Sequence, residues 1–120
     1  MITGIPKKYH IIADAAYIPL VWMAPKLLHF EDEQTVATIC KISAAADYTY
    51  TLFTDAPWGY HKIIPYKVHA LIDVAHGAAA LTTAVVLPIK NKRARNTLLA
   101  MGIVGLAVGA LSWIGSKHGN

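Results

Sequence analysis

The chain is 120 residues long, and 55% of its residues are hydrophobic while only 15% are charged. An average soluble domain carries about 25% charged residues, so this composition favours a membrane protein of one domain. The net charge of +4 suits an anionic lipid surface. It does not indicate nucleic-acid binding, because the basic residues gather at the ends of apolar segments and not on one amphipathic face. The single cysteine, Cys40, excludes an internal disulfide and a cysteine-based zinc site.

The first predicted helix covers about residues 8–30 and follows Pro6. Proline suits the first turn of a helix, because the N–H that it lacks would have no intrahelical partner there. A helix of this length can cross a hydrocarbon core of about 30 Å. Pro19 and Pro25 interrupt the segment. Membrane helices tolerate such prolines where neighbouring groups satisfy the freed carbonyls.

The second predicted helix, about residues 34–54, is the least apolar of the four. It contains Lys41 and Asp47 and a run of small residues at 43–46. A lysine near a helix end can extend its charge to the interface, and small residues let a neighbouring helix approach closely. A loop with turn-forming residues is predicted at 55–62.

The third predicted helix, about residues 65–89, is terminated by Pro88. A basic loop at 90–95 leads to the fourth helix, about residues 96–116. This last helix contains no charged residue and is the clearest membrane span. Its surface carries glycines that predict a close contact with another helix. They are Gly102, Gly105 and Gly109.

The first and third helices begin with a repeated motif. Segments 5–16 and 64–75 share the pattern Ile-Pro-x-Lys-x-His-x-x-x-Asp-x-Ala at an offset of 59 residues. Such self-similarity indicates an internal duplication. We therefore predict an all-α fold, a four-helix transmembrane bundle built from two parallel copies of a helical hairpin. The copies are about residues 5–54 and 64–116 of a single membrane domain that covers residues 1–120.

The repeat contains ionisable residues on one face of each helix. His10 and Asp14 share a face of the first helix because they are four residues apart. His69, Asp73 and His76 occupy the corresponding face of the third helix. Both helices begin on the same side of the predicted bundle, so their aspartates are expected at matching depth.

Counting back along the antiparallel second helix brings Asp47 to about the same depth. An aspartate at the centre of a membrane helix costs roughly 2.5–3.5 kcal/mol. We therefore expect these carboxylates to face the bundle interior and to pair there. The candidate proton or metal site consists of His10, Asp14, Asp47, His69, Asp73 and His76.

Three interpretations of this polar layer stay open. The first is structural, with histidine–aspartate hydrogen bonds that define the helix register. The second is proton or ion handling, because histidine titrates near neutrality. The third is a haem or divalent-metal site, since imidazole and carboxylate are suitable ligands. His10 and His69 suit a metal held between helices, whereas His69 and His76, about 10 Å apart along the axis, cannot share one ion.

The sequence contains no nucleophile–base pair, phosphate loop or nucleotide fingerprint, so it does not indicate an enzyme. It predicts a non-catalytic structural or accessory membrane module without a cofactor, whose partners are the lipid bilayer and further copies or subunits of a membrane complex. The alternative function is a small proton- or ion-coupled transporter, or a membrane redox subunit that binds haem or metal. A soluble helical bundle is a further alternative, because the first three helices are not cleanly apolar.

The segment Ala24-Pro25-Lys26-Leu27-Leu28-His29-Phe30 resembles the Ser-Pro-Trp motif that closes the first helix in SPW-repeat membrane proteins, which also duplicate a helix pair. Ala24 stands in place of the serine and Lys26 in place of the tryptophan, and the second copy keeps only Leu87-Pro88. The resemblance covers residues 5–116. It implies a small prokaryotic integral membrane protein of the bacterial inner membrane, and the family supplies no established chemistry.

Overall fold

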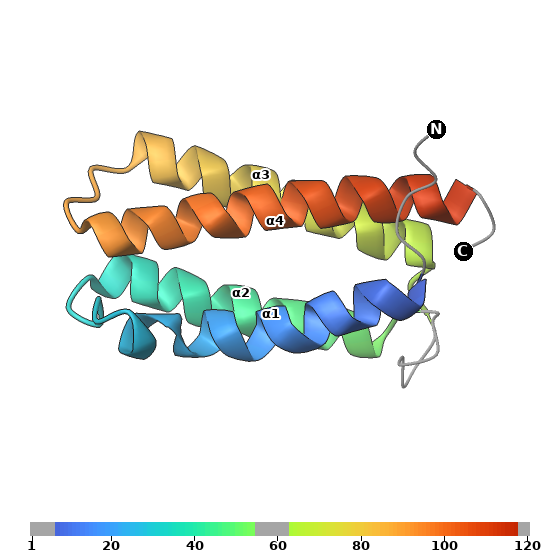
Figure 1. Cartoon of the computed structure of the whole chain (residues 1–120), viewed down its shortest axis with the longest axis horizontal. Helices are drawn as coiled ribbons and strands as arrows, with labels where there is room; N and C mark the ends of the chain where they lie inside the picture. Colours follow the sequence, from blue (N-terminus) through green and yellow to red (C-terminus); the bar gives the residue numbers. More distant parts are fainter. Residues whose placement is uncertain (1–6, 55–62, 118–120) are drawn as a thin grey trace.

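The computed structural model describes residues 7–54 and 63–117, and these residues form four α-helices and no strand. The helices are α1 (Lys7–Leu27), α2 (Gln34–Leu52), α3 (Tyr66–Val86) and α4 (Lys92–Lys117). They form two antiparallel hairpins, α1 with α2 and α3 with α4 (Figure 1). The connections within the two hairpins lie at the same end of the bundle (Figure 1). The predicted all-α fold is confirmed for this part of the chain, and the predicted loop at 55–62 lies outside it.

The end of α1 is set by a left-handed residue. His29 has a φ of 58°, and the backbone N–H of Phe30 donates to the carbonyl of Pro25 at 2.9 Å. This hydrogen bond and left-handed backbone are typical of the Schellman motif, which satisfies the last carbonyls of a helix. The chain then turns inward, so that Phe30 is fully buried.

Proline determines where α3 ends. Pro88 disfavours helical backbone at the residue that precedes it. Leu87 accordingly has extended backbone, with φ −75° and ψ 142°. The sequence predicts an end at about residue 89, whereas the helix ends at Val86.

An asparagine cap starts α4 earlier than the sequence interpretation predicts. The Asn91 side chain accepts hydrogen bonds from the backbone N–H groups of Arg93 and Ala94, at 3.0 and 3.2 Å. Side-chain acceptors at this position satisfy N–H groups that have no partner inside the helix. The basic segment predicted as a loop is therefore largely the first turn of α4, from Lys92 onward.

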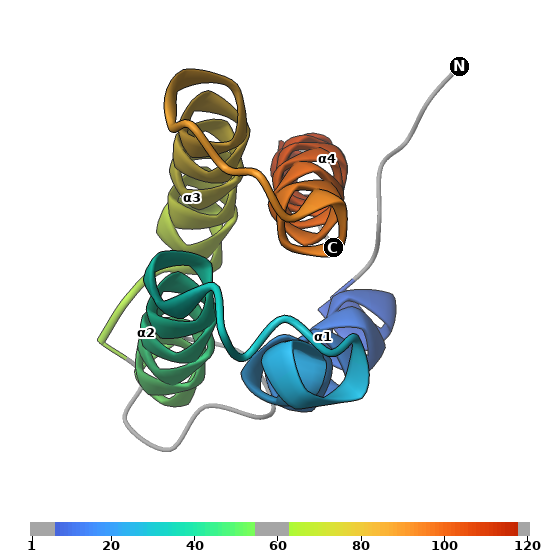
Figure 2. The ribbon, with the colours of Figure 1, turned by 90° about the vertical axis from the view of Figure 1, so that its left-hand side faces the viewer.

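The end-on view shows which helices are neighbours and which are diagonal. In Figure 2, α1 and α3 lie on opposite sides of the bundle axis, and so do α2 and α4. The closest pairing is α3 with α4, followed by α1 with α2. Within residues 7–54 and 63–117, α1 and α3 do not pack directly on each other. Contact between these two helices therefore depends on side chains that reach the axis.

Glycine permits the close approach of α3 and α4. A Cβ atom on Gly105 would lie 2.9 Å from the Cα of Gly77 and 3.0 Å from the carbonyl oxygen of Asp73. A Cβ atom on Gly109 would lie 2.8 Å from the carbonyl oxygen of Ala70. Side chains do not tolerate backbone at these distances, so the glycine face predicted on the fourth helix is in contact with α3.

The interior is divided along the bundle axis. Apolar residues fill the half nearer the two connections, and buried polar residues occupy the other half. The apolar core includes Val21, Phe30, Val36, Cys40, Ala84, Leu98 and Met101. His10 and Asp14 lie near the start of α1, so the candidate site lies between the apolar core and the end of the bundle where α1 begins. Figure 1 shows this end of α1 opposite the two connections.

The outer surface is strongly apolar. Each helix exposes a large aliphatic side chain, such as Ile12 and Ile42, both 63% exposed, Leu71 at 53% and Ile103 at 61%. Among the described residues, α3 and residues 92–115 of α4 are long and apolar enough to cross a membrane. Only 33% of each apolar window is buried inside the protein, so most of this apolar surface faces outward. The prediction of four spans is thus supported by length and composition for two helices.

Candidate functional site

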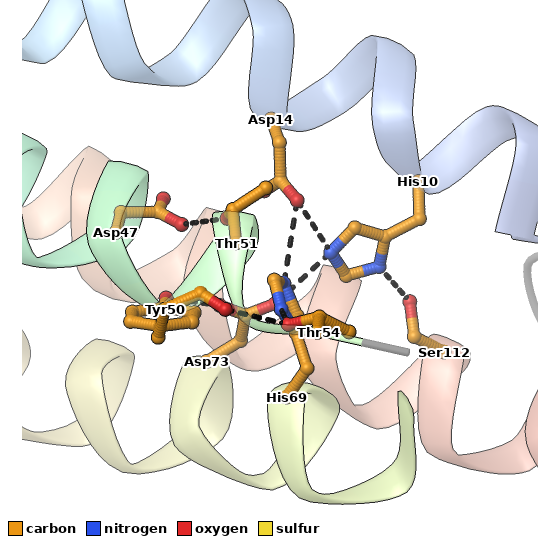
Figure 3. A network of polar contacts seen from close by, with 9 residues as sticks. All are labelled: His10, Asp14, Asp47, Tyr50, Thr51, Thr54, His69, Asp73 and Ser112. Carbon is orange, nitrogen blue, oxygen red and sulfur yellow. Dashed lines mark hydrogen bonds and ion pairs between the residues drawn. The ribbon is translucent and has the colours of Figure 1, made fainter. Parts of the chain in front are cut away.

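Four buried ionisable side chains meet on the bundle axis (Figure 3). His10 and Asp14 project from α1, and His69 and Asp73 project from α3. The spacing of four residues places each histidine and its aspartate on one helix face. Both histidines are completely buried, and the aspartates are only 6% and 7% exposed. We refer to these four residues as the axial cluster.

Nitrogen and oxygen atoms alternate in the axial cluster. The Nε2 atom of His10 lies 3.1 Å from Oδ2 of Asp14 and 3.1 Å from Oδ2 of Asp73. The Nε2 atom of His69 lies 3.3 Å and 3.5 Å from the same two oxygens. One ligand atom from each residue lies within 4.8 Å of every other. Each aspartate oxygen is thus shared by both histidines, and the cluster joins the two hairpins.

Hydroxyl groups from α4 and from the segment just after α2 orient the two imidazole rings. The Nδ1 atom of His10 lies 2.5 Å from Oγ of Ser112. The Nδ1 atom of His69 lies 2.6 Å from Oγ1 of Thr54, which donates its own proton to the carbonyl of Tyr50 at 2.6 Å. All four helices and the segment after α2 therefore contribute to the position of the axial cluster, and both Nε2 atoms are directed at the aspartates.

The carboxylate of Asp73 is also held by α2. The phenol of Tyr50 donates a hydrogen bond of 2.5 Å to Oδ1 of Asp73. This contact occupies one carboxylate oxygen and leaves Oδ2 for the histidines (Figure 3). The Tyr50 ring also packs edge-on against the His69 ring, with 4.8 Å between the ring centroids.

Asp47 and His76 lie beside the axial cluster and are not part of it. Asp47 is buried and accepts a hydrogen bond of 3.1 Å from the hydroxyl of Thr51, one turn further along α2. Together with Asp14 and Asp73, the two residues line a pocket of about 30 Å³. A buried water requires roughly 10–15 Å³, so this pocket accommodates water but no larger solute.

The structure thus brings together four of the six candidate residues. Asp47 lies outside the axial cluster because other residues, which follow it in the sequence, contact the cluster from the end of α2. Tyr50 follows Asp47 by three residues on the same face of α2, and Thr54 lies just after the helix; both contact the axial cluster at the level of His69. His76 is two turns from His69, which agrees with the prediction that these two histidines cannot share one metal ion.

Sequence reasoning missed the three residues that orient the cluster from outside. Ser112 carried a usable signal, because it is the only hydroxyl-bearing residue between Thr97 and Ser116 in an apolar helix. Tyr50 carried a weaker signal, since it shares a face of α2 with Asp47, and Thr54, just after the helix, carried none. Their distances from the histidine and aspartate side chains depend on how the helices pack.

A haem group does not fit this arrangement. The rings of His10 and His69 meet edge to face, with 4.9 Å between centroids and 77° between planes. Oδ2 atoms of Asp14 and Asp73 already lie between the two Nε2 atoms. A porphyrin ligated by both histidines would need this space, so the geometry favours the single-ion form of the cofactor alternative.

Comparison of the chain with protein-family models, with curated proteins and with solved structures finds no match. The resemblance to SPW-repeat proteins therefore stays a prediction. Two features of the chain bear on its function, the axial cluster and the apolar outer surface.

Proposed function

We propose that this protein is an integral membrane protein, a non-catalytic four-helix module of the bacterial inner membrane. The observation that carries the proposal is the distribution of polar and apolar groups. Ionisable residues gather on the bundle axis, while large aliphatic side chains point outward from every helix. Water-soluble bundles have the opposite arrangement. Lipid is the environment that suits an apolar exterior of this kind.

The polar residues of α1 and α2 are compatible with membrane insertion. His10, Asp14 and Asp47 lower the hydropathy of these helices, yet all three side chains are buried in the bundle. Inside a membrane, ionisable residues usually face the bundle interior and pair with one another. Lys41 is exposed and lies over the Trp22 ring, 4.6 Å from its centroid. It is close enough to the start of α2 for its charge to reach the interface.

The axial cluster supports a structural role within this module. The diagonal helices α1 and α3 have no direct backbone packing in the described residues. The axial cluster supplies two close nitrogen–oxygen contacts between these helices and one within each of them. Misaligning the two hairpins by one turn would separate these groups by about 5.4 Å. The cluster therefore favours one relative position of the hairpins.

The charged ends of the bundle support an orientation. A dense group of basic residues lies at the end with the two connections, and Lys90, Lys92, Arg93 and Arg95 form it. Basic residues next to membrane spans favour the cytoplasmic side. We therefore place the connections on the cytoplasmic face, with lipid, further copies of the chain or other membrane subunits covering the apolar surface.

Transport of a small solute is the weaker alternative. The pocket beside the axial cluster has a volume of about 30 Å³ and is lined by side chains of all four helices. Pockets that bind small molecules have volumes of roughly 300–1,000 Å³. The structural module requires no larger space beside the axial cluster than this pocket provides.

Membrane extraction tests the proposal. Washing isolated membranes with alkaline carbonate should leave the protein in the pellet, and release into the supernatant would contradict integral insertion. The variant Ile103→Asp sharpens the test, because a charge at the centre of a span costs roughly 2.5–3.5 kcal/mol. It should lower the membrane-integrated fraction, whereas the control Ile103→Leu should not. A soluble bundle would tolerate aspartate at this exposed position.

A further inference from the structure

We propose that the axial cluster binds one divalent transition-metal ion, with zinc as the expected occupant. The four ligand atoms would be Nε2 of His10 and His69 and Oδ2 of Asp14 and Asp73. This inference goes beyond the structural module. It does not depend on membrane insertion either, because one chain supplies all four ligands.

Four of the six distances between the ligand atoms match those around a tetrahedral ion, and all six atom pairs lie within 4.8 Å. The four nitrogen–oxygen separations in the axial cluster range from 3.1 to 3.5 Å. Zinc bound to histidine and carboxylate at about 2.0–2.1 Å in a tetrahedron separates its ligand atoms by about 3.3–3.4 Å. Side chains projecting inward from facing helices are also the usual source of ligands in bundle metal sites.

Three of the ligand atoms lack a hydrogen bond within the described part of the chain. They are Nε2 of His69 and the Oδ2 atoms of Asp14 and Asp73. The three side chains are 0%, 9% and 8% exposed. Buried polar atoms nearly always have a partner. These atoms approach one another to 3.3–3.5 Å, yet they form no hydrogen bond with one another.

The hydroxyl contacts assign the proton on one histidine. Thr54 has a single hydroxyl proton, which it donates to the carbonyl of Tyr50. Its oxygen can therefore only accept from Nδ1–H of His69. In a neutral imidazole this leaves the lone pair of Nε2 directed at the two aspartates. Metal-binding histidines usually donate their other N–H to a neighbouring group in this way.

The charge of the cluster also suits a divalent ion. Two carboxylates in a buried site need compensation by two positive charges. One divalent ion supplies both, and each imidazole then stays neutral, as a ligand must be. Mixed imidazole and carboxylate ligands in a tetrahedron favour zinc and similar ions over magnesium or calcium, which prefer six or more oxygen ligands.

The competing explanation is a purely proton-linked cluster, in which both histidines are positively charged and donate to the aspartates. The two explanations differ in one measurable property. A metal site binds one ion per chain with defined geometry, and a proton-linked cluster binds none. The test therefore uses metal ions alone as probes.

Purified full-length protein in detergent is treated with a chelator, freed of it, and titrated with Zn²⁺ and Co²⁺ by calorimetry and visible absorption. We expect one ion per chain, the intense visible absorption of four-coordinate cobalt, and loss of that absorption when zinc displaces it. Mg²⁺ should not compete. Folded wild-type protein that binds neither zinc nor cobalt would overturn the proposal, and so would the weak spectrum of six-coordinate cobalt.

Matched variants locate the site. Asp73→Asn should abolish the cobalt spectrum, whereas Asp47→Asn, which changes another buried aspartate outside the axial cluster, should keep it. Thr54→Val removes the hydroxyl that orients His69 and donates to the carbonyl of Tyr50. It should weaken the affinity by roughly 10–100-fold without changing the stoichiometry. If Asp73→Asn fails to fold, the wild-type and Thr54→Val titrations still decide. Undiminished binding in both Asp73→Asn and Thr54→Val would place the ion elsewhere.

Discussion

Two interhelical contacts in this bundle are built in opposite ways. Between α3 and α4, glycines bring the backbones together, as at Gly105, where a Cβ atom would lie 2.9 Å from the Cα of Gly77. Between α1 and α3, there is no direct packing in the described residues, and long polar side chains bridge the bundle axis. The first contact depends on the absence of side chains and the second depends entirely on their chemistry.

The difference shows how the two contacts depend on each other. His69 and Asp73 are on α3, and the carbonyl oxygen of Asp73 lies where a side chain on Gly105 would point. The glycine contact therefore positions the backbone that carries half of the axial cluster. A substitution in the glycine contact should therefore disturb the axial cluster. A substitution in the axial cluster should leave the glycine contact between α3 and α4 intact, because that contact lies within one hairpin.

Removing one histidine from the axial cluster should have the largest effect. His69→Ala leaves two buried carboxylates with half of their histidine contacts, and removing the partner of a buried charge costs about 3–5 kcal/mol. Chemical unfolding in detergent measures the loss. His76→Ala is the control, because His76 is only partly buried and outside the cluster. Equal losses in both variants would mean that the cluster adds no specific stabilisation.

Enlarging the glycine contact should have the next largest effect. Gly105→Leu forces a side chain against the backbone of α3, and overpacking of this kind costs typically 1–3 kcal/mol. The thermal midpoint in detergent should fall, and the axial cluster should be disturbed with it. Ala107→Leu adds the same bulk to an exposed position of the same helix. An unchanged midpoint in Gly105→Leu would contradict the close contact between α3 and α4.

Removing the cap of α4 should have the smallest of the three effects. Asn91→Ala deprives the N–H groups of Arg93 and Ala94 of their acceptor, at a cost of about 1 kcal/mol. Faster hydrogen exchange should be confined to the first turn of α4, far from the axial cluster. Asn96→Ala, at an exposed position inside the helix, should not increase this exchange. Exchange that increases throughout α4 would show that the cap acts on more than the helix end.

The helical fold and the main candidate residues were predictable because their signals are local. Four long apolar segments predict four helices. Pro6 predicts the approximate start of α1 and Pro88 the approximate end of α3. The spacing His-x-x-x-Asp, repeated after 59 residues, indicates that two pairs of ionisable side chains each share a helix face. The sequence by itself therefore determined which residues of α1 and α3 are available to pair.

The tertiary structure decided which of these residues meet and what surrounds them. Helical periodicity gives the direction of a side chain around its own helix, but not the rotation and height of one helix against another. Those depend on packing, here on the glycine contact between α3 and α4 and on the position of α2. For that reason Asp47 lies beside the axial cluster, while Thr54 and Ser112 orient its histidines from residues distant in the chain.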